Sequence, residues 1–248
     1  MSVRLYHGSP VILQRPEFGK GRKRNDYGQG FYTTLVPELG KEWAVDADRD
    51  GFLNIYDFDA QGLKIVDLNQ PCYSVLHWMA LLYANRDVRV PYAGAALRQA
   101  FLERFLPDIS EADIVIGYRA DDRYSRFARD FILNIISAKE LLDILHLGNL
   151  GQQFFIQSPT AFARLSFVHA EEVSSSEWFA SRQQREHDAA ESFNRMKTDK
   201  GLQSDGTYIR DILSGTADIR ALYNAQPVYN GYSIPEDCIL IQVPCGKL

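Results

Sequence analysis

The order of strand-like and helix-like segments is the feature that most constrains the fold of this chain. Runs of aromatic, β-branched and aliphatic residues, which favour strands, alternate irregularly with stretches whose apolar residues recur at helical spacing. This irregular order predicts an α+β fold with a mostly antiparallel sheet, rather than a doubly wound one. The expected strands span residues 3–7, 30–34, 52–58, 62–68, 113–117, 152–157 and 237–244, with 52–68 forming a hairpin.

Helical periodicity and capping residues together predict the helices. Proline suits the first helical position, serine suits the N-cap, and glycine suits the position just past the C-terminus. One helix is expected to begin near Pro37, and two more lie on either side of Pro91 between residues 71 and 106. A long helix is expected over 126–148, with Gly148 as its C-terminal cap, and a charged amphipathic helix over 174–197. A further helix is expected over 158–167, with Ser158 as N-cap and Pro159 at the first helical position.

Charge and cysteine content narrow the class of protein. The net charge of −5 gives no sign of nucleic acid or an anionic membrane as the main partner. No run approaches the ~18 apolar residues of a membrane span, and the first residues lack the apolar core of a signal peptide, so a cytoplasmic protein is expected. The cysteines at Cys72, Cys238 and Cys245 fit neither a disulfide framework nor a zinc site, so reduced thiols and no metal are expected.

Two glycine-bordered strand ends stand out near the N-terminus. One stretch reads VRLYHGSP and places His7 before Gly8, and the other reads NDYGQGFYTT and passes through Gly30 to Tyr32. Taken singly, such a His or Tyr is most often structural. Together, an imidazole edge, bare backbone amides and an aromatic face suit a flat aromatic amide joined to a sugar. The nicotinamide riboside half of NAD has those parts.

These stretches resemble the His and Tyr motifs of the diphtheria-toxin-like and poly(ADP-ribose) polymerase-like ADP-ribosyltransferases. In those enzymes a His-Gly pair on one strand precedes a glycine-rich loop that leads to a Tyr. LYHGS and YGQGFYTT match this order, and NIYDFD, ADIVIGYRADD and QQFFIQSPTAFARLSF resemble later blocks of an uncharacterised bacterial family of the same clan. The resemblance covers residues 3–170, and more loosely extends to 215.

The resemblance implies a split antiparallel β-sheet core with NAD bound across the cleft. By motif position, His7 binds ribose hydroxyls, the backbone of Gly8 holds the carboxamide, and the ring of Tyr32 stacks on nicotinamide. Ser9 and Gly30 complete the expected NAD contacts within the two motifs.

The third catalytic position of the resembled enzymes is often Glu, and the matching position here is Gln153, in GQQFFIQSP. Cleavage of the nicotinamide–ribose bond builds positive charge on the sugar. A carboxylate stabilises that charge, whereas a Gln amide supplies only a hydrogen bond. We therefore expect single ADP-ribose transfer rather than polymer synthesis. The alternative interpretation of Gln153 is a polar residue that faces solvent on an edge strand.

Other charged residues have two interpretations each. Asp121 and Asp122 either face the cleft, where one replaces the missing Glu, or cap the following helix. In the basic run KGRKR, we expect Arg22 or Arg24 to approach the NAD pyrophosphate. The alternatives are a solvated loop, or a docking site for an acidic target or nucleic acid. Trp43 is expected in the core.

The expected function is that of a mono-ADP-ribosyltransferase, which uses NAD and transfers ADP-ribose to a protein or nucleic-acid acceptor. A bacterial toxin with an antitoxin partner is one setting that the resemblance suggests. The alternatives are a non-catalytic NAD or ADP-ribose reader and an NAD glycohydrolase. We expect an ADP-ribosyltransferase-like domain over residues 1–170, with a helical insertion at about 71–150. Residues 171–248 then form a helical extension packed on the same domain.

Overall fold

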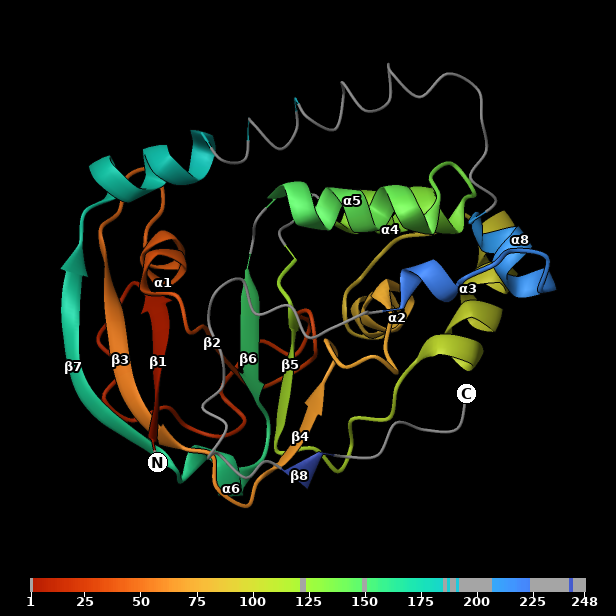
Figure 1. The fold of residues 1–248 in the computed structure, drawn as a ribbon. Coiled ribbons are helices and arrows are strands. Elements are labelled where there is room, and N and C mark those ends of the chain that lie inside the picture. The colour runs from red at the N-terminus through yellow and green to blue at the C-terminus, as the bar shows by residue number, and fades with distance from the viewer. Residues whose placement is uncertain are drawn as a thin grey trace.

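Two β-sheets and the helices packed on them form the protein (Figure 1). A three-stranded sheet has the strand order β1-β3-β7, and a five-stranded sheet has the order β2-β6-β5-β4-β8. Of the six strand pairs in the described residues, four are antiparallel and two are parallel, so the α+β prediction with a mostly antiparallel sheet is confirmed. This computed structural model describes residues 2–120, 124–148, 151–184, 187, 191, 207–223 and 241–242.

The three-stranded sheet is antiparallel throughout. β1 (Ser2–Ser9) pairs with β3 (Gly51–Asp59), which pairs on its other side with β7 (Leu165–Val173). A helix was expected over residues 158–167, but α6 (Pro159–Phe162) is a single turn and the chain then becomes β7. The segment after α6 makes its backbone hydrogen bonds with β3, a strand about 110 residues earlier in the chain. The local sequence does not reveal such a distant partner.

The five-stranded sheet is mixed. β6 (Gln152–Ile156) lies between β2 (Phe31–Thr33) and β5 (Ile114–Tyr118) and is antiparallel to both. β4 (Lys64–Asp67) pairs in parallel with β5 and with β8 (Ile241–Gln242). The expected C-terminal strand therefore exists, and it forms one edge of this sheet.

The predicted hairpin over residues 52–68 is wrong, because β3 and β4 belong to different sheets. Between them the chain turns at Gly62, which adopts a positive φ of 75°. Apolar side chains of both strands, Phe58 and Ile65 among them, then enter one buried cluster between the sheets. Because β3 and β4 bury apolar side chains in this cluster from opposite sheets, the two strands face each other across it instead of pairing.

Helices cover the outer faces of the sheets (Figure 1). The helices between β4 and β6, together with α8, pack on the five-stranded sheet through a large cluster that includes Trp78, Phe101 and Phe155. α1 begins at Pro37 as predicted and contacts β1 and β3. Residues 175–184 are also helical. The helix bounds are α1 (Pro37–Ala44), α2 (Val75–Asn85), α3 (Tyr92–Phe105), α4 (Tyr124–Ile132), α5 (Ala138–Gly148), α8 (Ile209–Ser214) and the 3₁₀ helix η1 (Arg220–Leu222).

The long helix predicted over residues 126–148 is two helices, α4 and α5. Asn134, between them, has a left-handed φ of 62° that ends the first helix. Ser137 and Glu140 form a reciprocal cap at the start of the second helix. The Ser137 hydroxyl accepts from the Glu140 N–H, and the Glu140 carboxylate accepts from the Ser137 N–H. This Ser-x-x-Glu pattern is a capping box, and it is a signal for the break that the sequence carries.

Cys72 corrects the expectation of three reduced thiols, because it is disulfide-bonded. The other two cysteines, Cys238 and Cys245, lie outside the described residues. Spacing in the sequence does not reveal this bond. The pairing of β8 with β4 returns the C-terminal part of the chain to the strand that precedes Cys72. Of the helices that the structure describes, none combines the length and apolar character needed to cross a membrane.

Gly8 lets α1 pack closely against β1. A Cβ atom at Gly8 would lie 2.5 Å from the backbone nitrogen of Ala44 and closer still to the carbonyl oxygen of Gly40. Backbone atoms of a packed helix cannot move aside cheaply, so this strand position requires glycine.

We predict that Gly8→Ala lowers the free energy of unfolding by about 3 kcal/mol or more, because the added methyl overpacks against α1. The melting temperature should fall by roughly 6–12 °C in a chain of this size. Gly62→Ala is the matched control, because Gly62 has a positive φ but open space around it. That control should lose only about 1–2 kcal/mol, from backbone strain. Equal losses in thermal or urea unfolding would contradict the close approach of α1.

Candidate functional site

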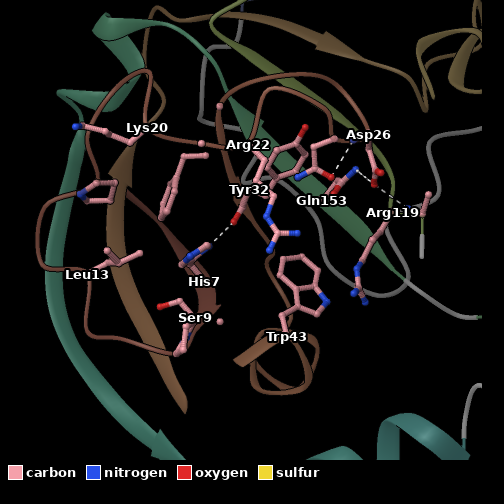
Figure 2. A pocket seen from close by; sticks show the side chains of 18 of the residues that line it. His7, Ser9, Leu13, Lys20, Arg22, Asp26, Tyr32, Trp43, Arg119 and Gln153 are labelled. Carbon is pink, nitrogen blue, oxygen red and sulfur yellow. Dashed lines mark hydrogen bonds between the residues drawn. The ribbon is translucent and has the colours of Figure 1, made fainter. Parts of the chain in front are cut away.

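A cleft of about 910 Å³ opens beside the neighbouring ends of β1 and β2 (Figure 2). The two strands come from the two stretches that the sequence singled out. Further walls come from the loop between these strands, from α1, and from the chain around β5 and β6. Of the predicted site residues, the cleft is lined by His7, Gly8, Ser9, Gly30, Tyr32 and Gln153.

The cleft exists because β1 and β2 stay paired at only one position. Tyr6 and Thr34 exchange two backbone hydrogen bonds, each 2.9 Å long. Backbone groups alternate in direction along a strand, so Gly8 presents its N–H and C=O on the same side as Tyr6. At Gly8 that side is the cleft. The parted strands therefore leave a backbone donor and acceptor next to each other on the wall.

His7 spans the gap between the parted strands. Its ring nitrogen Nδ1 lies 2.7 Å from the carbonyl oxygen of Tyr32. Burial lowers the pKa of His7 from 6.5 to about 4, against the opposing effect of that hydrogen bond, so the ring is neutral at pH 7. A carbonyl only accepts, so Nδ1 carries the proton and Nε2 keeps its lone pair. His7 thus offers a hydrogen-bond acceptor.

The hydroxyl of Tyr32 is committed to its own loop. It donates to the carbonyl of Gly28 at 2.7 Å and accepts from the N–H of Tyr27 at 3.0 Å. Burial raises the pKa of Tyr32 above its ordinary value. One side of the ring packs on Phe155, with ring centroids 4.8 Å apart. Tyr32 therefore serves the cleft through its ring rather than as an acid or nucleophile.

The absent side chains at Gly8 and Gly30 serve the packing of the chain on itself. At Gly8 the space is filled by α1, and at Gly30 a Cβ atom would lie 2.5 Å from the carbonyl oxygen of Ile156. Both glycines permit close packing of backbone segments, not the direct approach of a ligand to a bare α-carbon. Their backbones still line the cleft.

Gln153 is buried, with 2% of its surface exposed, and it lies on β6, an interior strand of the five-stranded sheet. The interpretation as a solvent-facing residue on an edge strand is therefore wrong. Its side-chain Nε2 donates to Asp26 at 3.0 Å and to the Tyr118 carbonyl at 3.2 Å (Figure 2).

The basic run before Gly30 divides into residues that line the cleft and residues that do not. Lys20 and Arg22 line it. Arg24 does not lie among the lining residues, and its guanidinium forms an ion pair of 2.8 Å with Asp87. Asp121 and Asp122 lie outside the described residues.

Sequence reasoning missed Asp26, Trp43 and Arg86, all of which line the cleft. Trp43 was expected in the core, but it projects from the end of α1 into the cleft, where the Arg119 guanidinium lies 4.7 Å from its ring (Figure 2). A signal for Asp26 was available in NDYGQG, where a carboxylate directly precedes the glycine-rich turn. Arg86 follows α2, far from either motif, and no local pattern pointed to it.

Positive charge predominates along the cleft, although the whole chain has a net charge of −5. Three carboxylates lie among the lining residues, and each pairs with a lining cation: Glu17 with Lys20, Asp26 with Arg86, and Asp46 with Arg49. In the part of the chain that the structure describes, six cationic side chains line the cleft: Lys20, Arg22, Arg49, Arg86, Arg119 and Arg182. Among these described residues the cations outnumber the carboxylates, which favours an anionic ligand.

We predict that His7 stays neutral from pH 8 down to about pH 5, so its ring NMR shifts stay constant over that range. Because its folded pKa is below the unfolded value of 6.5, the unfolded chain binds the proton first as the pH falls. The stability tied to neutral His7 is therefore present above pH 6.5 and is lost as the pH falls toward 4.

His7→Asn keeps an N–H donor but does not titrate, so the free energy of unfolding should depend less steeply on pH between 6.5 and 4. His77, whose pKa burial also lowers to about 4, contributes equally to both proteins and cancels in the comparison. Identical slopes in urea unfolding for parent and variant would contradict the buried, neutral ring.

Comparisons with known proteins place the chain by family. Curated proteins and solved structures gave no match. Residues 3–167, which are more than half of the chain and include every lining residue named above except Arg182, match the model of one family. The chain belongs to the family described as "Protein of unknown function (DUF3990)".

Proposed function

We propose that the protein is a mono-ADP-ribosyltransferase that cleaves NAD at the nicotinamide–ribose bond. The observation that carries the proposal is the conjunction of His7, Gly8 and Tyr32 on the walls of one cleft. The resemblance of the two motifs to ADP-ribosyltransferases supplied this expectation. Two sheets that meet at a single backbone pairing, Tyr6 with Thr34, also agree with the split-sheet core that the resemblance implies.

The wall around Gly8 suits the nicotinamide end of NAD. A primary carboxamide offers an oxygen acceptor and an N–H donor side by side. The N–H and C=O that Gly8 directs into the cleft complement that pair. Tyr32 and Trp43 come from different elements and line the same cavity, so both offer aromatic contacts to the flat pyridinium ring (Figure 2). The positive charge of that ring adds a cation–π attraction.

The ribose next to nicotinamide is matched by acceptors rather than donors. Sugar hydroxyls donate readily, and the Nε2 lone pair of neutral His7 accepts. Gln153 lines the same cleft and offers its amide oxygen, since its amide nitrogen is already hydrogen-bonded. The cationic side chains, with Arg22 on the loop, suit the two charges of the pyrophosphate. Arg24 is not needed for this role.

The reaction follows from where charge develops. The bond between ribose C1′ and the pyridinium nitrogen breaks, and its electron pair stays with nicotinamide, which leaves neutral. Positive charge then builds on the ribose, and an acceptor nucleophile attacks C1′ and loses its proton. Groups that lower the potential around C1′ therefore accelerate the step. With an amide at Gln153, single transfer to a protein or nucleic-acid acceptor is the expected outcome.

The test uses mass spectrometry to measure the release of nicotinamide from NAD, and calorimetry to measure NAD binding. Tyr32→Ala and Trp43→Ala should each weaken NAD binding by roughly 10- to 100-fold, through loss of about 1.5–3 kcal/mol of ring contact. Tyr92→Ala is the matched control, because Tyr92 is 98% exposed and is not among the residues that line the cleft, and this variant should bind NAD as the parent does.

The outcomes separate the proposal from its alternatives. Transfer of a single ADP-ribose to an acceptor supports the proposal. Release of nicotinamide with water as the only acceptor identifies a glycohydrolase instead. NAD or ADP-ribose binding without release of nicotinamide identifies a non-catalytic reader, an alternative that the amide at Gln153, in place of a carboxylate, favours. Unchanged NAD affinity in both aromatic variants would show that the cleft is not the NAD site.

A further inference from the structure

Asp26 is a buried carboxylate at the edge of the cleft that neither motif predicted. Only 2% of its surface is exposed. Its Oδ2 accepts from the Gln153 side-chain amide at 3.0 Å and from the Ala120 N–H at 2.9 Å. Its Oδ1 lies 2.6 Å from the Arg86 guanidinium. A carboxylate with this many partners is rigidly placed.

These contacts fix which way the amide of Gln153 points. Its Nε2 donates to the Asp26 carboxylate and the Tyr118 carbonyl, which can only accept. Gln153 also has a side-chain hydrogen bond with the Tyr27 hydroxyl, whose own proton goes to the Tyr118 carbonyl. A flipped amide would turn its oxygen against two other oxygens, so the orientation is determined by the network. Among the described residues, the amide oxygen Oε1 makes no hydrogen bond. Because Gln153 lines the cleft, this oxygen is the atom it offers to a ligand.

We infer that Asp26 is a positioning residue for the reaction, acting through Gln153. It holds the Gln153 amide oxygen toward the ribose, and its negative charge polarises that amide across the shared hydrogen bond. Asp26 and Gln153 together thus take the part that a single Glu plays at the matching position of the resembled enzymes. This inference rests on the proposed function, because it assigns a role in cleaving the nicotinamide–ribose bond.

Arg86 makes the arrangement possible at a buried site. An unpaired carboxylate away from water is strongly unfavourable, and the guanidinium supplies the compensating charge. The Arg86 side chain is 15% exposed and the Asp26 side chain 3%, so the pair is largely shielded from solvent. The ion pair therefore places a charge-compensated carboxylate at the edge of the cleft, where it acts on Gln153.

The position of Asp26 also decides what a carboxylate at position 153 would do. The sequence alone predicts that Gln153→Glu holds or raises nicotinamide release, because a carboxylate stabilises the charge that builds on the ribose. In this structure the new carboxylate would meet Asp26 at about the distance of the present hydrogen bond. Two carboxylates sharing one site repel each other, and one of them takes up a proton. Gln153→Glu should therefore lose activity, and Asp26→Asn with Gln153→Glu should recover part of it by moving the charge to position 153.

The experiment is a double-mutant cycle on nicotinamide release, with kcat and KM measured separately. Asp26→Asn should lower kcat by about 10-fold and leave the KM for NAD within about 3-fold, because the lost hydrogen bond acts mainly on developing charge. Gln153→Ala should lower kcat by about 10-fold or more. Asp26→Asn should cost little further in the Gln153→Ala background, since the residue through which it acts is gone. Asp87→Asn, which alters a carboxylate outside the cleft lining, is the control and should keep the parent kcat.

Additive losses in the cycle would overturn the inference, because Asp26 would then act independently of Gln153. A parent-like kcat in Asp26→Asn would overturn it as well. If Asp26→Asn does not fold, the parent provides the test by NMR. Both side-chain amide protons of Gln153 should exchange slowly with water and show a nuclear Overhauser contact to the Ala120 or Tyr118 backbone.

Rapid exchange of either amide proton would show that the orientation is not fixed. This measurement also separates the two proposals when the parent releases no nicotinamide. Inactivity alone then counts against the proposed function and the role that rests on it, whereas the NMR result still reports whether Asp26 orients Gln153.

Discussion

The parting of β1 from β2 after a single pairing is the constraint on which the rest of the site depends. If the two strands had continued side by side, Gly8 would pair with β2 and no backbone groups would remain for a ligand. Instead the side chain of His7 reaches the Tyr32 carbonyl at 2.7 Å and substitutes for the missing backbone bond. The tight packing of α1 on Gly8 holds β1 in place from the other side.

The polar groups of the cleft divide into those used by the fold and those left for a ligand. The Tyr32 hydroxyl, the His7 Nδ1 and the Gln153 Nε2 are all hydrogen-bonded within the chain. What remains is the ring of Tyr32, the backbone N–H and C=O of Gly8, and two side-chain acceptors, one on His7 and one on Gln153. Acceptors that are fixed before substrate arrives meet the condition for stabilising the positive charge that the proposed cleavage develops.

Local sequence signals predicted the elements better than their partners. Ser158 does cap α6, because its hydroxyl accepts from the Ala161 N–H, and Pro37 does begin α1. Which strand joins which sheet depends on contacts between distant residues, so the hairpin predicted after β3 is wrong and the strand β7 was not foreseen. A continuous apolar period also concealed the break between α4 and α5.

The same limit applies to the site. His7, Gly8, Tyr32 and Gln153 could be named from motif order, and the structure brings all four to one cleft. Asp26 and Trp43 could not be ranked above structural residues, because their importance arises from neighbours 127 positions away in one case and from the direction of α1 in the other. Arg22 lines the cleft, whereas Arg24 forms an ion pair with Asp87. The basic run alone does not show which of its arginines faces the cleft.

The central claim is that the parted strands bind a primary carboxamide through the backbone of Gly8, and the most direct measurement is the NMR shift of the Gly8 amide. Titration with nicotinamide should move this signal downfield at saturation, together with ring-current shifts near Tyr32. Pyridine, which keeps the ring but lacks the carboxamide, should move it far less, because it brings no carbonyl oxygen to the Gly8 N–H. Equal responses to the two compounds, or shifts confined to residues outside the cleft, would contradict the account.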